Sequence, residues 1–237
     1  MHSRSDLLRG LGNGLPIGLG YLSVSFGFGI MASRAGLSVT ETTLISLTNL
    51  TSAGQAAGVD VIASHGSLME MALVQLTINI RYALMALTLS QKLGSRFTLP
   101  RRLLAAYGIT DEIFAVCAAE KGEIQPSYMY GVILIATIGW VLGTFLGAAA
   151  GSLLPQAVTD ALGIVLYGMF IAIIVPPARR ERPVLFTVAV AAGLSLVCRY
   201  LLTMLSGGFA VILCAVVAAA AAAWLFPIKD EEEEDAA

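Results

Sequence analysis

The stretch "SLTNLTSAGQAAGVD", residues 46–60, interrupts the apolar run at residues 42–63. Small and polar residues permit irregular backbone, and their side chains can hydrogen-bond to the amide groups that a broken helix leaves unpaired. The stretch contains such small or polar residues, among them Asn49, Thr51, Ser52, Gly54, Gln55 and Gly58. The stretch therefore predicts a break where an ordinary membrane-crossing helix would be continuous.

The composition around this stretch indicates an integral membrane protein. Of the 237 residues, 57% are hydrophobic and 13% are charged, whereas charged residues make up about 25% of a typical soluble domain. Apolar runs near the length that spans a bilayer recur at 15–31, 42–63, 68–89, 103–119, 128–150, 157–175, 184–205 and 208–226. Because the runs lack strict alternation, helices are favoured over a barrel. We expect an all-α, polytopic membrane protein with seven or eight membrane helices, one of them broken or re-entrant.

The domain organisation predicted from these runs is simple. Residues 1–14 form a cytosolic N-terminal segment, residues 15–228 a membrane transport domain, and residues 229–237 an acidic tail. The net charge of -2, without a long basic cluster, gives no indication of a nucleic-acid partner. No Walker A, HExxH or GxSxG motif occurs, so we expect a protein that is not an enzyme and needs no cofactor.

Basic residues between the runs constrain the topology. Arg4 and Arg9 precede the first run, and a second basic group lies within residues 92–102. Such groups favour the cytoplasmic side of the membrane. If every run crossed, three crossings would place the two groups on opposite faces. The conflict disappears if residues 42–63 enter the membrane and return on the same side.

A second polar island, "QLTINIRYALM" at residues 75–85, puts Asn79 and Arg81 in the middle of an apolar run. A charge there costs several kcal/mol, so such residues usually mark a substrate or ion pathway. The counter-ion of Arg81 is expected to be Asp111 or Glu112. These acids are adjacent, and successive helical positions differ by about 100°, so both cannot face one partner equally. The alternative is that Arg81 reaches the interface or forms a purely structural ion pair.

The islands suggest a division of roles. Half-helix N-termini around Asn49, Ser52, Gly54 and Gln55 could face a substrate carboxylate, although close packing through small residues would explain the same composition. Proton coupling could involve Asp111, Glu112 or Asp60, because a desolvated carboxylate can exchange protons near neutral pH. Asp60 could equally lie among lipid headgroups.

Three motifs in this order resemble the AzlC family of branched-chain amino acid exporters, also called LIV-E permeases. They are "SAGQ" at 52–55, "NIRY" at 79–82 and "TDEIF" at 110–114. The specific part of the resemblance covers residues 15–115. Tyr82 stands where the family often has His, and "SAGQ" departs from the family's Gly-small-small-Gln step.

The resemblance implies export of hydrophobic amino acids such as leucine, isoleucine, valine or methionine, driven by the proton gradient. It also implies a second, small membrane subunit of the AzlD type, and a multi-pass location in the bacterial cytoplasmic (inner) membrane. The alternative is an accessory or channel-like membrane subunit whose polar islands serve packing and partner docking.

Overall fold

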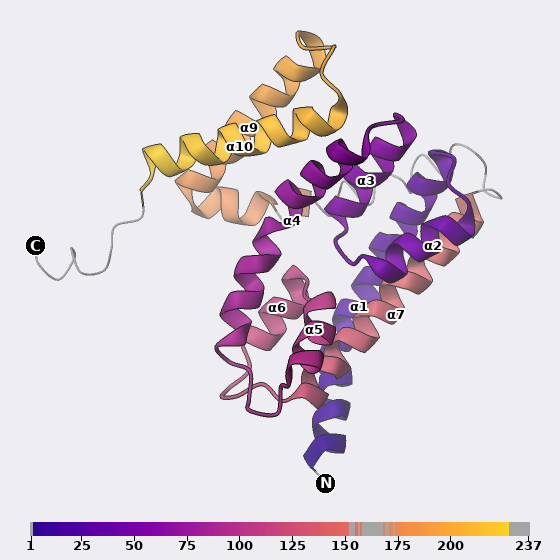
Figure 1. Cartoon of the computed structure of the whole chain (residues 1–237), viewed down its shortest axis with the longest axis vertical. Coiled ribbons are helices and arrows are strands. Elements are labelled where there is room, and N and C mark those ends of the chain that lie inside the picture. The colour runs from indigo at the N-terminus through magenta and orange to yellow at the C-terminus, as the bar shows by residue number, and fades with distance from the viewer. Residues whose placement is uncertain are drawn as a thin grey trace, which may run out of the picture. The chain divides into compact units, whose positions relative to one another are not determined.

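The computed structural model describes residues 2–151, 155, 157, 168, 171–172 and 174–227. Within these residues every regular element is a helix, which confirms the all-α prediction. The helices are α1 (His2–Arg34), α2 (Val39–Thr48), α3 (Ala53–Ala63), α4 (Leu68–Ser90), α5 (Leu99–Tyr107), α6 (Asp111–Ala118), α7 (Pro126–Gly151), α9 (Arg182–Tyr200) and α10 (Gly207–Leu225) (Figure 1). Apart from isolated positions, the predicted run at 157–175 lies outside the described residues, as does the acidic tail.

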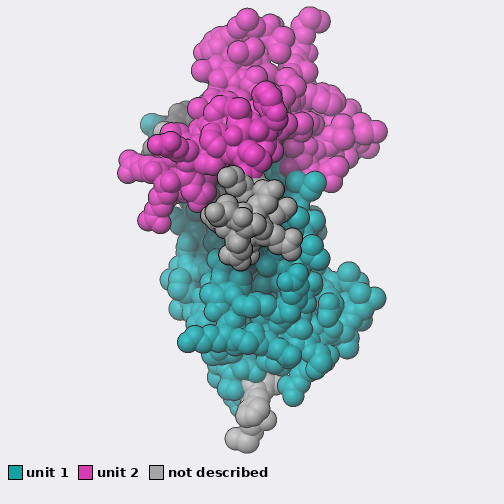
Figure 2. Space-filling model, turned by 90° about the vertical axis from the view of Figure 1, so that its left-hand side faces the viewer, with its two compact units in different colours: residues 1–59, 78–167 teal, residues 60–77, 168–237 magenta. Residues whose placement is uncertain are grey.

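The chain forms two compact units, coloured separately in Figure 2. Unit 1 comprises Met1–Val59 and Ile78–Tyr167, and unit 2 comprises Asp60–Thr77 and Gly168–Ala237. Helices α3 and α4 each continue from one unit into the other. The predicted site residues belong to unit 1, with the exception of Asp60.

Five of the described helices are long and apolar enough to cross a membrane: α1, α4, α7, α9 and α10. The predicted count of seven or eight is therefore not confirmed. The difference has two sources. Two of the eight apolar runs are divided into shorter helices, α2 with α3 and α5 with α6, and a third run lies outside the described residues.

Helices α1 and α7 lie side by side in unit 1 (Figure 1) and form its centre. A Cβ atom on Gly18 would lie 2.7 Å from the carbonyl oxygen of Ile135, and one on Gly139 would lie 2.9 Å from Gly18 Cα. Further along, Gly147 faces Phe26 in the same way. Contacting positions increase together along both helices, so the two run parallel. Glycine at these positions lets the backbones approach closely.

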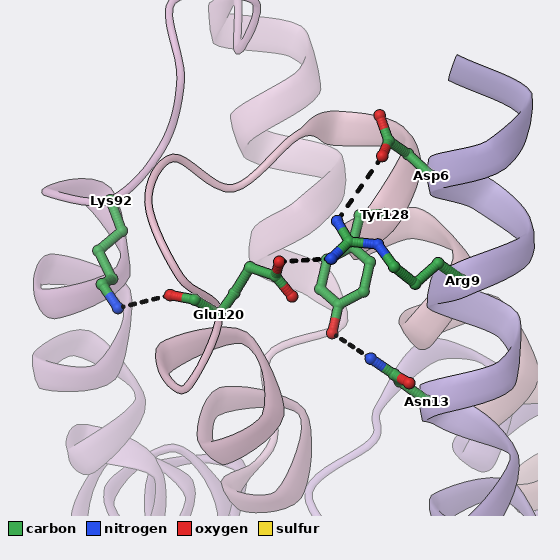
Figure 3. Close-up of polar contacts among 6 residues, drawn as sticks. All are labelled: Asp6, Arg9, Asn13, Lys92, Glu120 and Tyr128. Carbon is green, nitrogen blue, oxygen red and sulfur yellow. Dashed lines mark hydrogen bonds and ion pairs between the residues drawn. The ribbon is translucent and has the colours of Figure 1, made fainter. Parts of the chain in front are cut away.

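A cluster of polar residues connects α1 with the segments around Lys92 and Glu120 (Figure 3). We call the end of unit 1 at which this cluster lies the basic end. The Arg9 guanidinium lies 2.5 Å from a carboxylate oxygen of Glu120 and 4.6 Å above the ring centre of Tyr128. Lys92 donates to the backbone carbonyl of Glu120 at 3.1 Å. Both predicted basic groups therefore lie at one end of unit 1. A re-entrant segment at 42–63 requires this placement, and its return to the same side stays a prediction.

Helices α5 and α6 form a hairpin whose two ends both lie at the basic end. The Ile124 amide donates to the Lys92 carbonyl at 2.8 Å, and the Gly94 amide donates to the Ile124 carbonyl at 3.2 Å. The prediction of one uninterrupted run at 103–119 is wrong. The turn is fixed by tertiary packing, because a Cβ atom at Gly108 would overlap the Ile133 side chain, with Ile133 Cγ1 2.7 Å away.

Helices α2 and α3 flank a break at residues 49–52, as the polar stretch predicts. Asn49 ends α2 with extended backbone, and Ser52 has a φ of 37°, in the left-handed region that side chains disfavour. The Tyr107 hydroxyl at the end of α5 donates to the Leu47 carbonyl at the end of α2. The tips of the two broken elements therefore touch inside unit 1.

Candidate functional site

Two half-helices begin at these tips, and their first turns differ in charge. Helix α6 starts with Asp111 and Glu112, and the Thr110 hydroxyl accepts a hydrogen bond from the Ile113 amide at 3.4 Å. Helix α3 starts at Ala53 and has no acid in its first turn. Free N–H groups give a helix N-terminus a partial positive charge. The α3 tip therefore favours an anionic group, while the acids of α6 favour a cationic one.

Gln55 lies at the α3 tip and is only 2% exposed. Its amide nitrogen donates to the Ser46 hydroxyl at 2.8 Å, and its amide oxygen accepts from the Trp140 indole N–H at 2.9 Å. The Ser46 hydroxyl is also 2.8 Å from the Thr144 hydroxyl. Burying an amide without such partners costs several kcal/mol in an apolar interior. The network thus fixes the tip of α3 to α2 and α7.

Tyr21 in the middle of α1 reaches the other tip. Its hydroxyl oxygen lies 2.7 Å from Thr110 Oγ1 and 2.5 Å from a carboxylate oxygen of Glu112. Its ring meets the Trp140 ring edge to face, with centroids 5.2 Å apart. A continuous series of contacts therefore runs from Glu112 through Tyr21 and Trp140 to Gln55.

Arg81 forms its ion pair with Asp111, at an N–O distance of 2.9 Å. The side chains are 43% and 41% exposed, so the pair is accessible rather than sealed in the interior. The Arg81 guanidinium also lies 5.2 Å from the centre of the Tyr82 ring. The sequence left open which acid is the counter-ion of Arg81. In the structure Asp111 faces Arg81, while Glu112 faces Tyr21.

The other predicted residues occupy separate positions. The Asn49 side-chain oxygen accepts from the Thr51 hydroxyl at 2.6 Å, within the break. Gly54 is buried in the first turn of α3, and Asn79 is partly buried on α4, two positions before Arg81. Asp60 is exposed and belongs to unit 2.

Three residues of these contacts were not predicted from the sequence: Tyr21, Trp140 and Thr144. Each lies in an apolar helix that reads as an ordinary membrane span, and its partner is far away along the chain. The spacing of Trp140 and Thr144, which flank Gly143 on the glycine face of α7, is the one local signal that could have drawn attention to them. No group of three or more His, Cys, Asp and Glu side chains that could hold a metal ion occurs among the residues described.

Comparison with known proteins relates the chain to one family and to membrane proteins. The family model described as AzlC protein matches residues 16–154, which include both tips. The inner membrane protein YgaZ of Escherichia coli K12 is 29% identical over 198 residues, which cover 81% of this chain and 81% of YgaZ. An uncharacterized membrane protein of Archaeoglobus fulgidus is 30% identical over 229 residues, 94% of this chain and 99% of its own. No solved structure matches the chain.

Proposed function

The chain belongs to the AzlC family of membrane proteins, and from that premise we propose that it is a secondary transporter that exports branched-chain or other hydrophobic amino acids. It acts in the bacterial cytoplasmic (inner) membrane as a multi-pass protein and works with a small AzlD-type subunit. Export is coupled to the proton gradient. The inner-membrane relative YgaZ and the apolar helices support this location.

The observation that carries the proposal is that two half-helix N-termini of opposite electrostatic character are linked through Tyr21 and Trp140. Transporters commonly build their sites from such discontinuous helices near the middle of the membrane. A zwitterionic amino acid would place its carboxylate at the N-terminal end of α3, around Ser52, Gly54 and Gln55, where the helix dipole is positive. Its ammonium group would meet Asp111 at the α6 tip, where Arg81 holds the carboxylate in position.

The surroundings of the tips suit a hydrophobic side chain. Ile109 and Phe114 flank the start of α6 and pack against the core that contains Tyr21 and Trp140. Apolar side chains with a few polar groups that fix orientation are typical of small-molecule sites. A leucine or valine side chain would gain by leaving water for such surroundings, at about 25 cal/mol per Å² of buried apolar surface.

The proposal is tested by efflux of labelled leucine, valine and methionine from loaded cells, with and without an AzlD-type subunit, at two external pH values. We expect faster efflux that needs the subunit and responds to pH. Gln55→Ala and Asn79→Ala should abolish it at an unchanged amount of protein in the membrane. Thr48→Ala is the matched control, because the exposed Thr48 hydroxyl bonds to carbonyls of its own helix. Unchanged efflux under all conditions contradicts the proposal.

One observation favours the alternative of an accessory or channel-like subunit. Gln55 is buried, and both polar atoms of its amide already have partners within the chain, Ser46 and Trp140. If packing is its purpose, Gln55→Ala lowers the amount of assembled protein and leaves the transport rate per assembled molecule unchanged. Measuring both quantities on the same membranes separates the two functions.

A further inference from the structure

Tyr21 and Trp140 lie between the two tips and touch both of them. We propose that Glu112 carries the coupling proton, and that Tyr21 and Trp140 are positioning residues that link its protonation to the substrate-binding state of Gln55. The inference rests on the proposed function and assigns separate roles to the adjacent acids of α6. It also gives a transport role to two aromatic residues that the sequence motifs do not include.

The partners of the two acids decide which one carries the proton. Asp111 lies 2.9 Å from the Arg81 guanidinium, so a proton on Asp111 would leave Arg81 without its counter-ion. Glu112 is instead held by the neutral hydroxyl of Tyr21. Among the described residues, Glu112 interacts with the titratable groups of Tyr21 on α1, Tyr82 on α4 and Asp111 on its own helix, and Asp111 in turn pairs with Arg81 on α4. Glu112 can take up a proton while the Arg81 ion pair stays intact.

Protonation would reverse the direction of the hydrogen bonds at Tyr21. The phenol has one proton, and a charged Glu112 accepts it at 2.5 Å. A protonated Glu112 gains an O–H group of its own, which can donate to the Tyr21 oxygen in the reversed arrangement. The phenolic proton then turns to Thr110 Oγ1, which lies 2.7 Å away. Thr110 is the N-cap of α6, so the exchange acts directly on the tip of that half-helix.

Close packing carries this change to the other tip. Tyr21 is 8% exposed and Trp140 is 2% exposed, and their rings are in edge-to-face contact. Densely packed side chains transmit small displacements because there is little free volume to absorb them. A shift of the Tyr21 ring therefore moves Trp140, whose indole N–H holds the Gln55 amide.

The test uses the chain with its small subunit in liposomes, and measures KM and the maximal rate of leucine transport over a series of pH values. Tyr21→Phe keeps the ring against Trp140 and removes the donor that favours charged Glu112. Protonation then occurs more readily. The midpoint of the pH profile should move to higher pH by about one unit or more, the effect of losing a hydrogen bond to a charged group.

Two further variants test the Glu112 end and the Gln55 end of the link separately. Glu112→Gln still accepts from Tyr21 but cannot titrate, so leucine exchange should persist while dependence on the proton gradient is lost. Trp140→Phe keeps the ring contact and removes the donor to Gln55. We expect KM to rise about fivefold to tenfold, as for a lost hydrogen bond, with the pH midpoint unchanged.

Tyr107→Phe is the control, because it loses the hydrogen bond to the Leu47 carbonyl and does not contact Glu112. Its pH midpoint should equal that of the wild type. A folded Tyr21→Phe protein with an unmoved midpoint, or with a lower maximal rate alone, overturns the inference. If Tyr21→Phe does not fold, a fully retained pH dependence in Glu112→Gln overturns it. A wild-type protein that transports none of the three amino acids contradicts the proposed function itself.

Discussion

Asp111 and Glu112 illustrate how neighbouring residues acquire different surroundings on a helix. Asp111 faces a guanidinium on α4, and Glu112 faces a phenol on α1. The angular separation of adjacent helical positions predicted that they would not share one partner, and this is confirmed. Which acid would meet Arg81 depended on where α1 and α4 lie, and so required the folded structure.

The Arg81–Asp111 pair gives a prediction at this scale. Arg81→Asp should abolish amino acid export, because it places an acid opposite Asp111, so that three acids lie together at the α6 tip. The double variant Arg81→Asp with Asp111→Arg should recover the ion pair and the amount of protein in the membrane. It should not recover export, because the tip then presents a cation to the substrate ammonium group. Immunoblots and efflux assays on the same cells measure both effects.

The cost of the exchanged charge at the helix start is small, about 0.3–1 kcal/mol for a cation near a helix N-terminus. The double variant should therefore fold. If it exported as fast as the wild type, the pair would be purely structural, which is the alternative that the sequence left open.

At the scale of elements, the parallel contact between α1 and α7 depends on glycine. Gly139→Ala should lower the free energy of unfolding by about 1–3 kcal/mol, as overpacking does. Its Cβ atom would lie 2.9 Å from Gly18 Cα and closer still to the Gly18 carbonyl group, which cannot move aside without shifting α1. Denaturation of the purified protein in detergent measures the change.

Gly20→Ala is the matched control, because a Cβ atom at Gly20 has no heavy atom within 4 Å. Alanine should there leave the stability unchanged or raise it by up to about 1 kcal/mol, the usual gain over glycine inside a helix. Equal loss of stability in both variants would contradict the role of the close contact between α1 and α7, because Gly20 lacks that contact.

The start of α2 provides another prediction at this scale. Ser38 and Glu41 form a capping box, and hydrogen bonds from Ser38 hold the pKa of Glu41 below its ordinary value. Ser38→Ala should weaken the first turn by about 1 kcal/mol, which speeds hydrogen exchange there about fivefold.

The capping box also makes the stability of α2 depend on pH. Because the folded pKa of Glu41 is lowered, its contribution to stability is complete above the ordinary glutamate pKa. It is lost as the pH falls through the lower folded value. If hydrogen exchange in α2 were the same in Ser38→Ala as in the wild type, the capping role of Ser38 would be contradicted.

The two broken elements differ in how far the sequence revealed them. The break at 49–52 is marked by its own polar residues and was predicted. The break at 108–110 falls within the apolar run at 103–119, where the sequence predicted a continuous helix. It forms because Gly108 fits against Ile133 and because residues 92–94 pair with Ile124, contacts that no local pattern encodes.

At the scale of the whole molecule, the meeting of Arg9, Lys92 and Glu120 at one end supports a segment at 42–63 that returns to the side it entered. The prediction is tested with Thr40→Cys and His65→Cys in a chain whose native cysteines, Cys117, Cys198 and Cys214, are replaced. A maleimide that cannot cross the membrane should label both positions from the periplasmic side. Thr40 and His65 are exposed, and Thr40 leaves the Ser38 cap intact.

Ser95→Cys is the control for sidedness, because Ser95 is exposed in the loop at the basic end. It should be labelled only after the cytoplasmic face is opened. Labelling of positions 40 and 65 from opposite faces would mean that the segment crosses the membrane, and the topology would need another explanation for its basic residues.

The sequence by itself determined the membrane class, the helical architecture, the first break and the polar islands at 46–60 and 75–85. These features follow from composition and short-range spacing, since hydrocarbon excludes unpaired polar groups wherever they occur along a chain. The tertiary structure decided the second break, the partner of Arg81 and the aromatic link through Tyr21 and Trp140. Tyr21 and Thr110 are 89 positions apart, and Gln55 and Trp140 are 85 apart. Such contacts depend on the relative placement of whole helices, which close glycine packing and buried hydrogen bonds fix only in the folded chain.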